Sequence, residues 1–185
     1  MKFRAIPIFH ILTGIFTAVS LYSCATTNPQ ITDEIEPVNF VKVSDRLVTS
    51  GQPSTSQIAR LNSLQYRLVI NLAPIDGGAK YLDEAYLLGK MGIAYTAIPV
   101  DIHRPQYRDF ALFSNILNSV EKEKIWVHCQ VNHRASLFAF LYRVIHEGAD
   151  LDRAYEKVSE VWMPTPNWLN FANETLAKHN ITYDF

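Results

Sequence analysis

The sequence is poor in cysteine and has no excess of either charge. Its two cysteines, Cys24 and Cys129, lie in such different settings that a disulfide between them is not expected. Its 17 basic residues balance 18 acidic ones, and the formal net charge is −1. No basic field therefore favours a nucleic-acid partner, and no acidic tail favours disorder.

Metal-ligand spacing and internal repeats are also missing. His103, His146 and His179 are not spaced as metal ligands, and Cys129 has no partner cysteine, so no metal is expected. The sequence contains no low-complexity block and implies no organic cofactor. A length of 185 residues suits one domain with a real core plus some peripheral sequence.

The N-terminal apolar stretch is too short and too interrupted for a transmembrane span. Residues 1–23 begin with Lys2 and Arg4 and contain no acidic residue, which is typical of a secretory signal peptide. The stretch leads into Leu21-Tyr22-Ser23-Cys24, which resembles a bacterial lipoprotein box, so we expect lipidation of Cys24. An uncleaved anchor, or an ordinary signal with an incidental cysteine, is the alternative.

These features predict a periplasmic protein attached to a membrane by an N-terminal lipid anchor. Ala25, and not aspartate, follows the cysteine, which favours the outer membrane of a bacterium. Residues 24–38 are rich in Thr, Asn, Pro, Asp and Glu and have little periodicity, so we interpret them as a flexible tether. The folded domain is expected to span residues 39–185.

Short apolar strands alternate with helical stripes through the expected domain. Strands are expected at 40–43, 46–50, 67–72, 93–100 and 124–128. Helices are expected after Ser54, with Ile58, Leu61 and Leu64 on the apolar side, and at 80–90, 109–120, 135–146, 151–162 and 167–179. This alternation predicts a single α/β domain with a central, mostly parallel sheet flanked by helices. Ligand sites of such sheets lie at the carboxyl ends of strands, where Asp101 and Cys129 are both placed.

The stretch from Ile125 to Ser136 concentrates the chemistry of the chain. An apolar strand ends in Cys129, a short polar loop follows, and Arg134 opens a long apolar helix. Backbone N–H groups and the helix dipole at such a junction favour an anion and a thiolate. We expect Cys129 to be a nucleophile under an oxyanion clamped by Arg134, with the Ser136 hydroxyl assisting departure of the thiolate. The plainer alternative is a buried structural cysteine followed by an ordinary surface arginine.

Several short motifs stand out along the chain. They are Ser50-Gly51-Gln52-Pro53-Ser54, Val69-Ile70-Asn71-Leu72, Ile98-Pro99-Val100, Val127-His128-Cys129 through Arg134-Ala135-Ser136, Leu141-Tyr142-Arg143-Val144 and Trp162-Met163-Pro164. These motifs resemble those of cysteine-dependent protein tyrosine phosphatases, in the dual-specificity-like group, and most closely a bacterial branch of phosphatase-like proteins. The resemblance covers roughly residues 39 to 175. It implies a dual-specificity-phosphatase-like fold and hydrolysis of phosphate monoesters, phosphotyrosine or other, through a phosphocysteine intermediate. The implied partner is a phosphorylated protein or small molecule.

The cysteine loop is one residue shorter than the signature that it resembles. Four residues separate Cys129 from Arg134, whereas the phosphatase signature has five. Ser136 keeps its distance from the cysteine, and Asn132, which tolerates positive φ, stands where the family has glycine. Four intervening residues also occur in rhodanese-type sulfurtransferases, so sulfur transfer and a catalytically weak oxyanion-binding pseudophosphatase stay open. With Arg134, the phosphate-binding residues expected in this loop are Gln130, Val131, Asn132 and His133.

Cleavage of a phosphate monoester needs a proton for the leaving oxygen, and the resemblance implies an aspartate after an upstream strand. Asp101 is the candidate, with simple solvation of a loop carboxylate as its alternative. Asp109 is second, although a carboxylate at the start of a helix also stabilises that helix. His128 is expected to support the thiolate, or else to be a satisfied core histidine. His133 either adds positive charge beside the oxyanion when protonated or points to solvent.

Tryptophans and arginines outside the loop have simpler interpretations. Trp126, Trp162 and Trp168 are expected in the core or at an interface, with one of them at the substrate mouth as the alternative. Arg104 and Arg108, near Asp101, could contact a second anionic group, but a solvated surface is the simpler expectation. The physiological substrate and the oligomeric state stay open.

Overall fold

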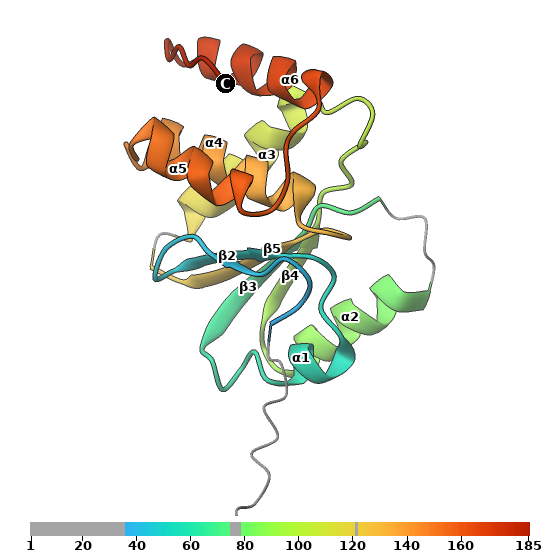
Figure 1. The fold of residues 1–185 in the computed structure, drawn as a ribbon. Helices are drawn as coiled ribbons and strands as arrows, with labels where there is room; N and C mark the ends of the chain where they lie inside the picture. The colour runs from blue at the N-terminus through green and yellow to red at the C-terminus, as the bar shows by residue number, and fades with distance from the viewer. Residues whose placement is uncertain (1–35, 75–78, 121) are drawn as a thin grey trace, which may run out of the picture. The chain divides into compact units, whose positions relative to one another are not determined.

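The computed structural model describes residues 36–74, 79–120 and 122–185 (Figure 1). The expected signal peptide, the expected lipidation site Cys24 and most of the expected tether lie outside these residues. The carbonyl of Val38, one residue before the expected domain boundary, accepts a hydrogen bond from Gly51 at 2.7 Å. None of the helices in the described part of the chain combines the length and the apolar character that a membrane crossing requires.

A five-stranded sheet forms the middle of the domain, in the order β1-β2-β5-β3-β4. β1 runs antiparallel to β2, and the other neighbouring strands are parallel. The expected single α/β domain with a central, mostly parallel sheet is therefore confirmed. The strands are β1 (Val41–Lys42), β2 (Leu47–Ser50), β3 (Tyr66–Asn71), β4 (Ala94–Ala97) and β5 (Lys124–His128).

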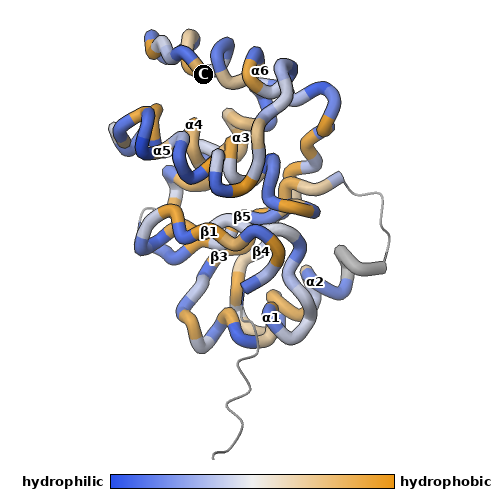
Figure 2. The backbone as a smooth tube through the Cα atoms, in the orientation of Figure 1, coloured by the Kyte–Doolittle hydropathy of each residue, from blue (hydrophilic) through white to orange (hydrophobic). Residues whose placement is uncertain are grey.

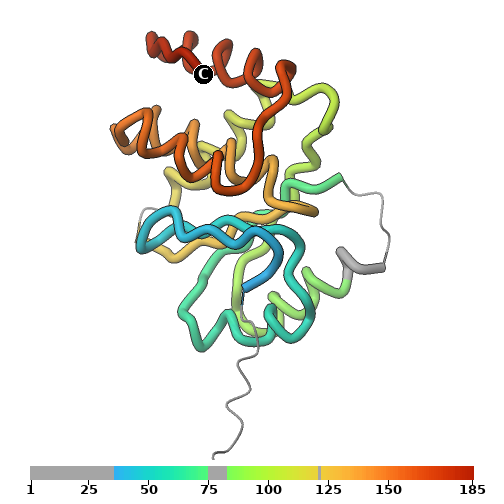
Figure 3. Tube along the Cα trace, viewed as in Figure 1, coloured from blue at the N-terminus to red at the C-terminus, as the bar shows by residue number. Residues whose placement is uncertain are grey.

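Helices cover both faces of this sheet (Figure 1). On one face lie α1 (Thr55–Ala59) and α2 (Ala79–Lys90). On the other side lie α3 (Tyr107–Ser119), α4 (His133–His146), α5 (Leu151–Ser159) and α6 (Pro166–Ala177). Figure 3 follows the chain to its red C-terminal end, which lies on the same side of the sheet as α3 to α6.

β5 is buried on both faces. Ile125 and Val127 join the large hydrophobic cluster under α3, α4 and α6, whereas Trp126 points to the smaller cluster under α1 and α2. Such two-sided burial explains the continuous apolar run of this strand. The outer helix α5, in contrast, carries mainly hydrophilic residues, and its buried residues are Ala154 and Val158 (Figure 2).

Some element boundaries differ from the expected ones for local reasons. β4 ends at Ala97 because Pro99, two residues later, has no N–H for the ladder. α1 starts at a capping box between Ser54 and Gln57 but ends at Ala59, so Leu64 lies beyond it and is 39% exposed. α4 starts at His133, two residues earlier than expected, directly after a left-handed residue.

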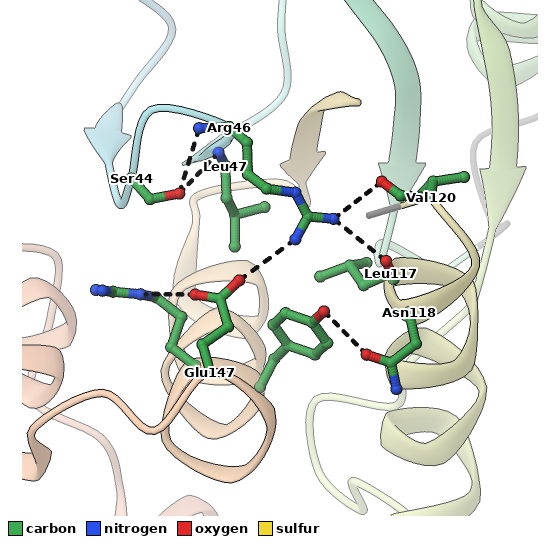
Figure 4. A network of polar contacts seen from close by, with 9 residues as sticks. Ser44, Arg46, Leu47, Leu117, Asn118, Val120 and Glu147 are labelled. Atoms are coloured by element: carbon green, nitrogen blue, oxygen red, sulfur yellow. Dashed lines mark hydrogen bonds and ion pairs between the residues drawn. The ribbon is translucent and has the colours of Figure 1, made fainter. Parts of the chain in front are cut away.

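At the amino end of the sheet, the Arg46 side chain binds the backbone carbonyls at the C-terminal end of α3. One guanidinium nitrogen, Nη2, donates to the carbonyls of Leu117 and Val120, each at 3.2 Å (Figure 4). The other, Nη1, donates to Oε1 of Glu147 at 3.3 Å, and Arg143 Nε donates to Oε2 of the same carboxylate at 3.3 Å. The last carbonyls of α3 thus gain a cationic partner, and that cation gains an anionic one.

Candidate active site

The candidate site forms where β5 meets α4. Because β5 lies between β2 and β3, the loop after it is flanked by the residues that follow both of those strands. Cys129 is 1% exposed, and its N–H donates to the carbonyl of Ser50 at 3.2 Å. Val131 forms an isolated bridge with Gly51. The loop therefore lies against the end of β2. Cys129 stands at its start, and α4 follows it directly in the sequence.

Asn132 makes the turn from the loop into α4. Its φ is 72°, a left-handed conformation that asparagine tolerates better than most residues. The residue is fully buried, and its Nδ2 donates to the carbonyl of Asn39 at 2.5 Å and to Oγ1 of Thr49 at 3.1 Å. A residue from the start of the domain thus contacts the loop directly.

Arg134 is a buried cation without a carboxylate partner. It is 4% exposed, its Nη1 donates to the carbonyl of Leu72 at 3.0 Å, and its Nη2 donates to Oε1 of Gln130 at 2.5 Å. Its Nε has no hydrogen-bond partner, and no carboxylate among the described residues lies within ion-pair distance of it. The alternative of an ordinary surface arginine is therefore wrong. Because a buried charge is costly unless it is paired, this guanidinium fits an oxyanion.

A buried carboxylate lies against His128, the residue before Cys129. Glu84, on α2, is 2% exposed, and its Oε1 is 2.9 Å from Nε2 of the fully buried His128. The two atoms are close but not aligned as a hydrogen bond, while Oε2 of Glu84 accepts from Nε2 of Gln52 at 3.3 Å. His128 is thus buried against an acid and is not simply a satisfied core histidine. In the described part of the chain, no three His, Cys, Asp or Glu side chains converge as metal ligands.

The first turn of α4 contains Ser136 and His133. Ser136 is 4% exposed, and its hydroxyl donates to the carbonyl of His133 at 3.1 Å, so its role beside the sulfur stays a prediction. The His133 ring stacks on Trp162, with centroids 4.3 Å apart and planes 3° from parallel. Burial, and then the neighbouring Arg134 charge, lower the pKa of His133 below its usual range. At neutral pH the ring is uncharged, and its contact with Trp162 is one of packing.

The two candidate acids lie in different settings. Asp101 follows Val100, whose N–H donates to the Leu72 carbonyl that also accepts from Arg134, so the Asp101 loop begins beside that arginine. Oδ1 of Asp101 accepts from the backbone N–H of His103 at 2.8 Å, and this bond, with help from Arg104, lowers the pKa of the carboxyl. Asp101 is therefore a carboxylate at neutral pH in this conformation, and its role as a proton donor stays a prediction.

Asp109 belongs to the first turn of α3 and lies 3.5 Å from Arg108 Nε. Its carboxylate therefore has the helix-stabilising setting that was the alternative to catalysis. Arg104 and Arg108 are both strongly exposed, as expected for solvated surface. Trp126 and Trp168 are core residues, and Trp162 is the tryptophan that contacts the loop.

Sequence reasoning missed Glu84 and Asn39. A usable signal existed for Glu84, because it lies four residues before the buried Leu88 and therefore on the same side of α2. No comparable signal marks Asn39, whose contact with the loop joins residues 93 positions apart. Gly51 belongs to one of the motifs in the sequence, but its close approach to the backbone of Gln130 and Val131 is visible only in the structure.

Comparison with known proteins gives several similar chains, although no family model matches. The dual specificity protein phosphatase TpbA of Pseudomonas aeruginosa is 27% identical over 139 residues, which are 74% of this chain and 61% of that protein. The chain thus matches about three fifths of the length of this relative.

Two solved structures extend the comparison. A putative phosphatase (DUF442) from Shewanella putrefaciens CN-32 has a TM-score of 0.69 at 27% identity, covering 77% of this chain and 94% of that one. A TpbA variant from P. aeruginosa in complex with pTyr has a TM-score of 0.54 at 22% identity, covering 66% and 72%. At that lower identity the second likeness concerns the fold alone.

Proposed function

Because this chain belongs to the protein tyrosine and dual-specificity-phosphatase-like superfamily, in its bacterial DUF442 and TpbA-like branch, we propose that it hydrolyses phosphate monoesters with Cys129 as nucleophile. The observation that carries this proposal is the buried guanidinium of Arg134, which has neutral acceptors but no carboxylate partner among the described residues. A phosphoryl group supplies the missing negative charge and bidentate acceptors.

The proposed reaction has two steps. The Cys129 thiolate attacks phosphorus, the S–P bond forms, the bond from phosphorus to the leaving oxygen breaks, and that oxygen takes a proton from Asp101. A water molecule then attacks the phosphocysteine, gives its proton to Asp101 and releases phosphate and the thiolate. Arg134 and the N–H groups of the loop stabilise charge on the non-bridging oxygens, and Ser136 assists departure of the thiolate.

Asp101 must change its surroundings to perform this role. The backbone N–H of His103 stabilises its charged form, so a proton donor needs that bond to be lost when substrate binds. Hydrogen bonds of catalytic groups often differ between free and substrate-bound enzymes. The proposed acid is therefore a loop residue that reorients on binding.

Sulfur transfer is the second candidate, and the four-residue spacing between Cys129 and Arg134 favours it. A persulfide on Cys129 would carry the transferred sulfur in place of a phosphoryl group. A weakly catalytic oxyanion-binding protein is the third possibility and shares the same buried arginine.

Purified protein assayed with a generic aryl phosphate in the presence of a metal chelator tests the phosphatase. We expect turnover at some pH from about 5 to 8, with complete loss in Cys129→Ser. Ser63→Ala, at an exposed position far from Cys129 in the sequence, is the control and should show no loss. Absence of turnover throughout that range contradicts the phosphatase. Thiocyanate formation from thiosulfate and cyanide supports sulfur transfer, and phosphate protection of Cys129 from alkylation without either activity supports oxyanion binding.

We also propose that Cys24 is lipidated and that the domain acts on phosphorylated proteins or small molecules in the periplasm. The support is the lipoprotein-box resemblance of residues 21–24. Palmitate labelling that is lost in Cys24→Ser, together with accumulation of unprocessed protein under globomycin, is the expected result. Unlabelled protein in the cytoplasm contradicts this location.

A further inference from the structure

The phosphate-binding loop is contacted from outside by the first residues of the described chain. Nδ2 of Asn39 donates to the carbonyl of Val131 at 3.0 Å, and Nδ2 of Asn132 donates to the carbonyl of Asn39 at 2.5 Å. Each asparagine therefore uses its side-chain amide to bind the backbone of the other's segment. Because a carbonyl can only accept, the amide nitrogen and not the oxygen must face it in both cases.

Both asparagines have left-handed backbones. The φ angles are 53° at Asn39 and 72° at Asn132, and asparagine is among the few residues that adopt this region at low cost. The same residue type thus satisfies two demands at each position, a turn in the chain and a side-chain donor. Alanine would satisfy neither.

Gly51 makes the close approach of these segments possible. Its N–H donates to the Val38 carbonyl at 2.7 Å, and the next residue, Gln52, donates its N–H to the Gln130 carbonyl at 3.1 Å. A Cβ at position 51 would lie 2.9 Å from the Gln130 carbonyl oxygen and 3.0 Å from that of Val38. Two successive loop carbonyls, those of Gln130 and Val131, therefore have fixed partners outside the loop.

We propose that Asn39 and Asn132 form an asparagine clasp that holds the shortened phosphate loop in its oxyanion-binding conformation, and that Asn39 is a positioning residue of the site. The proposal rests on the phosphate-binding role of the loop. A loop with four residues between cysteine and arginine has few internal groups to order it, and the clasp orders it from β2 and the segment before β1. Preorganised donors bind an oxyanion without a further ordering cost.

Asn39→Gly in the full chain removes the amide donor and keeps a backbone that adopts positive φ freely. Asn39→Asp keeps the size of the side chain but removes the donor, and Asn132→Gly removes the other half of the clasp. Asn180→Gly is the matched control, because Asn180 also has a left-handed backbone, with φ 59°, and its side chain makes no hydrogen bond within the described part of the protein.

Amide hydrogen exchange over residues 130–134 decides the question. We expect each clasp variant to exchange about tenfold faster there, to bind inorganic phosphate about tenfold more weakly in a Cys129 alkylation-protection assay, and to lose about tenfold in kcat/KM. Asn180→Gly is expected to match the wild type in all three, and circular dichroism should show every variant folded.

The outcomes separate this proposal from the phosphatase itself. Faster loop exchange and weaker phosphate binding in a protein without turnover support the clasp and contradict phosphatase activity. Normal turnover in the wild type with unchanged loop exchange in Asn39→Gly and Asn39→Asp overturns the clasp. Equal losses in Asn180→Gly also overturn it, because the effect would then belong to left-handed asparagines in general.

Discussion

A half-buried arginine and a buried one lie at opposite ends of the same sheet. Arg46, before β2, and Arg134, after β5, each donate to backbone carbonyls at the end of another element, and each leaves its Nε without a partner. The difference is charge. Arg46 has the carboxylate of Glu147, which it shares with Arg143 (Figure 4), whereas Arg134 has only neutral acceptors among the described residues.

This difference separates an arginine whose charge is paired within the fold from one whose charge has no carboxylate partner among the described residues. The Arg46 cluster is electrostatically complete in the folded chain, so adding a phosphate there would displace an existing partner. The Arg134 guanidinium is stabilised by dipoles but not neutralised, which is costly in a buried position. An oxyanion bound beside the guanidinium would pair this charge and remove the cost.

The strongest test of this comparison is activity after an arginine-to-lysine change at each end. Arg134→Lys is expected to lower kcat/KM by roughly 10²–10³-fold, because lysine lacks the planar pair of donors. Arg46→Lys is expected to leave kcat/KM unchanged. Steady-state assays with an aryl phosphate measure both, and similar losses in the two variants would contradict the assignment of separate roles.

Phosphate binding should also distinguish the two ends. If phosphate binds as proposed, a concentration of 100 times Kd should stabilise the wild-type protein by about 2.7 kcal/mol, and the Arg46→Lys protein by the same amount. Arg134→Gln should lose this stabilisation. Thermal unfolding with phosphate, and with chloride at equal ionic strength, gives the readout, and equal stabilisation of all three proteins by both salts would rule out a specific site at Arg134.

Stability should depend on the Arg46 side chain more than on that of its neighbour Arg143. Arg46→Ala removes one donor each from the carbonyls of Leu117 and Val120 and one of the two cations on the Glu147 carboxylate, and we expect a loss of about 2 kcal/mol. Chemical denaturation measures the free energy of unfolding. Arg143→Ala, which removes the second cation on Glu147 but no helix-end donor, is the control and should cost less.

Glu84 is a buried charge of the opposite sign and sharpens the comparison. Glu84→Gln removes the acidic group facing His128 but keeps the shape, and we expect kcat to fall about tenfold because the acid that lies 2.9 Å from Nε2 of His128, the residue before Cys129, is lost. Asp83→Asn, on the exposed neighbouring position of α2, should be neutral. A pH–rate profile of Glu84→Gln identical to that of the wild type would argue for a purely structural role.

The smallest expected effect is on the titration of His133. Its pKa is lowered by burial and by Arg134, so the folded state binds its proton less readily than the unfolded state. Stability contributed by this neutral ring is therefore present above its usual value near 6.5 and is lost as pH falls through the lowered pKa. In Arg134→Gln the pKa of His133, followed by NMR, should rise but stay below 6.5, whereas Arg46→Gln should not change it.

The fold and the centre of the site could be predicted from the sequence because their signals are local. The apolar run of β5, the cysteine at its end and the apolar helix after it lie within a single stretch of about two dozen residues, and the strand-to-helix geometry follows from that order. The burial of Arg134 was not predictable in the same way. It depends on Leu72 and Gln130 both accepting from the guanidinium, and Leu72 directly follows another strand, β3.

The features of the site that the sequence did not predict depend on contacts between distant segments of the chain. Glu84 faces His128 only because α2 lies over the end of β5, and Asn39 meets Asn132 only because β1 and β2 bring the start of the domain to the loop. The Asp101 prediction depended on strand order alone, which gives the right end of the sheet but not the orientation of the carboxylate. The His103 N–H that binds Asp101 is two residues away and belongs to a loop without periodicity.

The parallel stack of His133 on Trp162 places an intrinsic fluorophore against the residue that follows the loop. Trp126 and Trp168 are buried, and their indole N–H groups donate to Ser50 and Ile102, whereas Trp162 is only partly buried. Trp162 lies against the ring of His133 in the first turn of α4, directly after the loop, so the surroundings of its indole change when this ring moves or takes up a proton. The emission of this one tryptophan can therefore follow loop ordering and proton uptake in real time, without an added label.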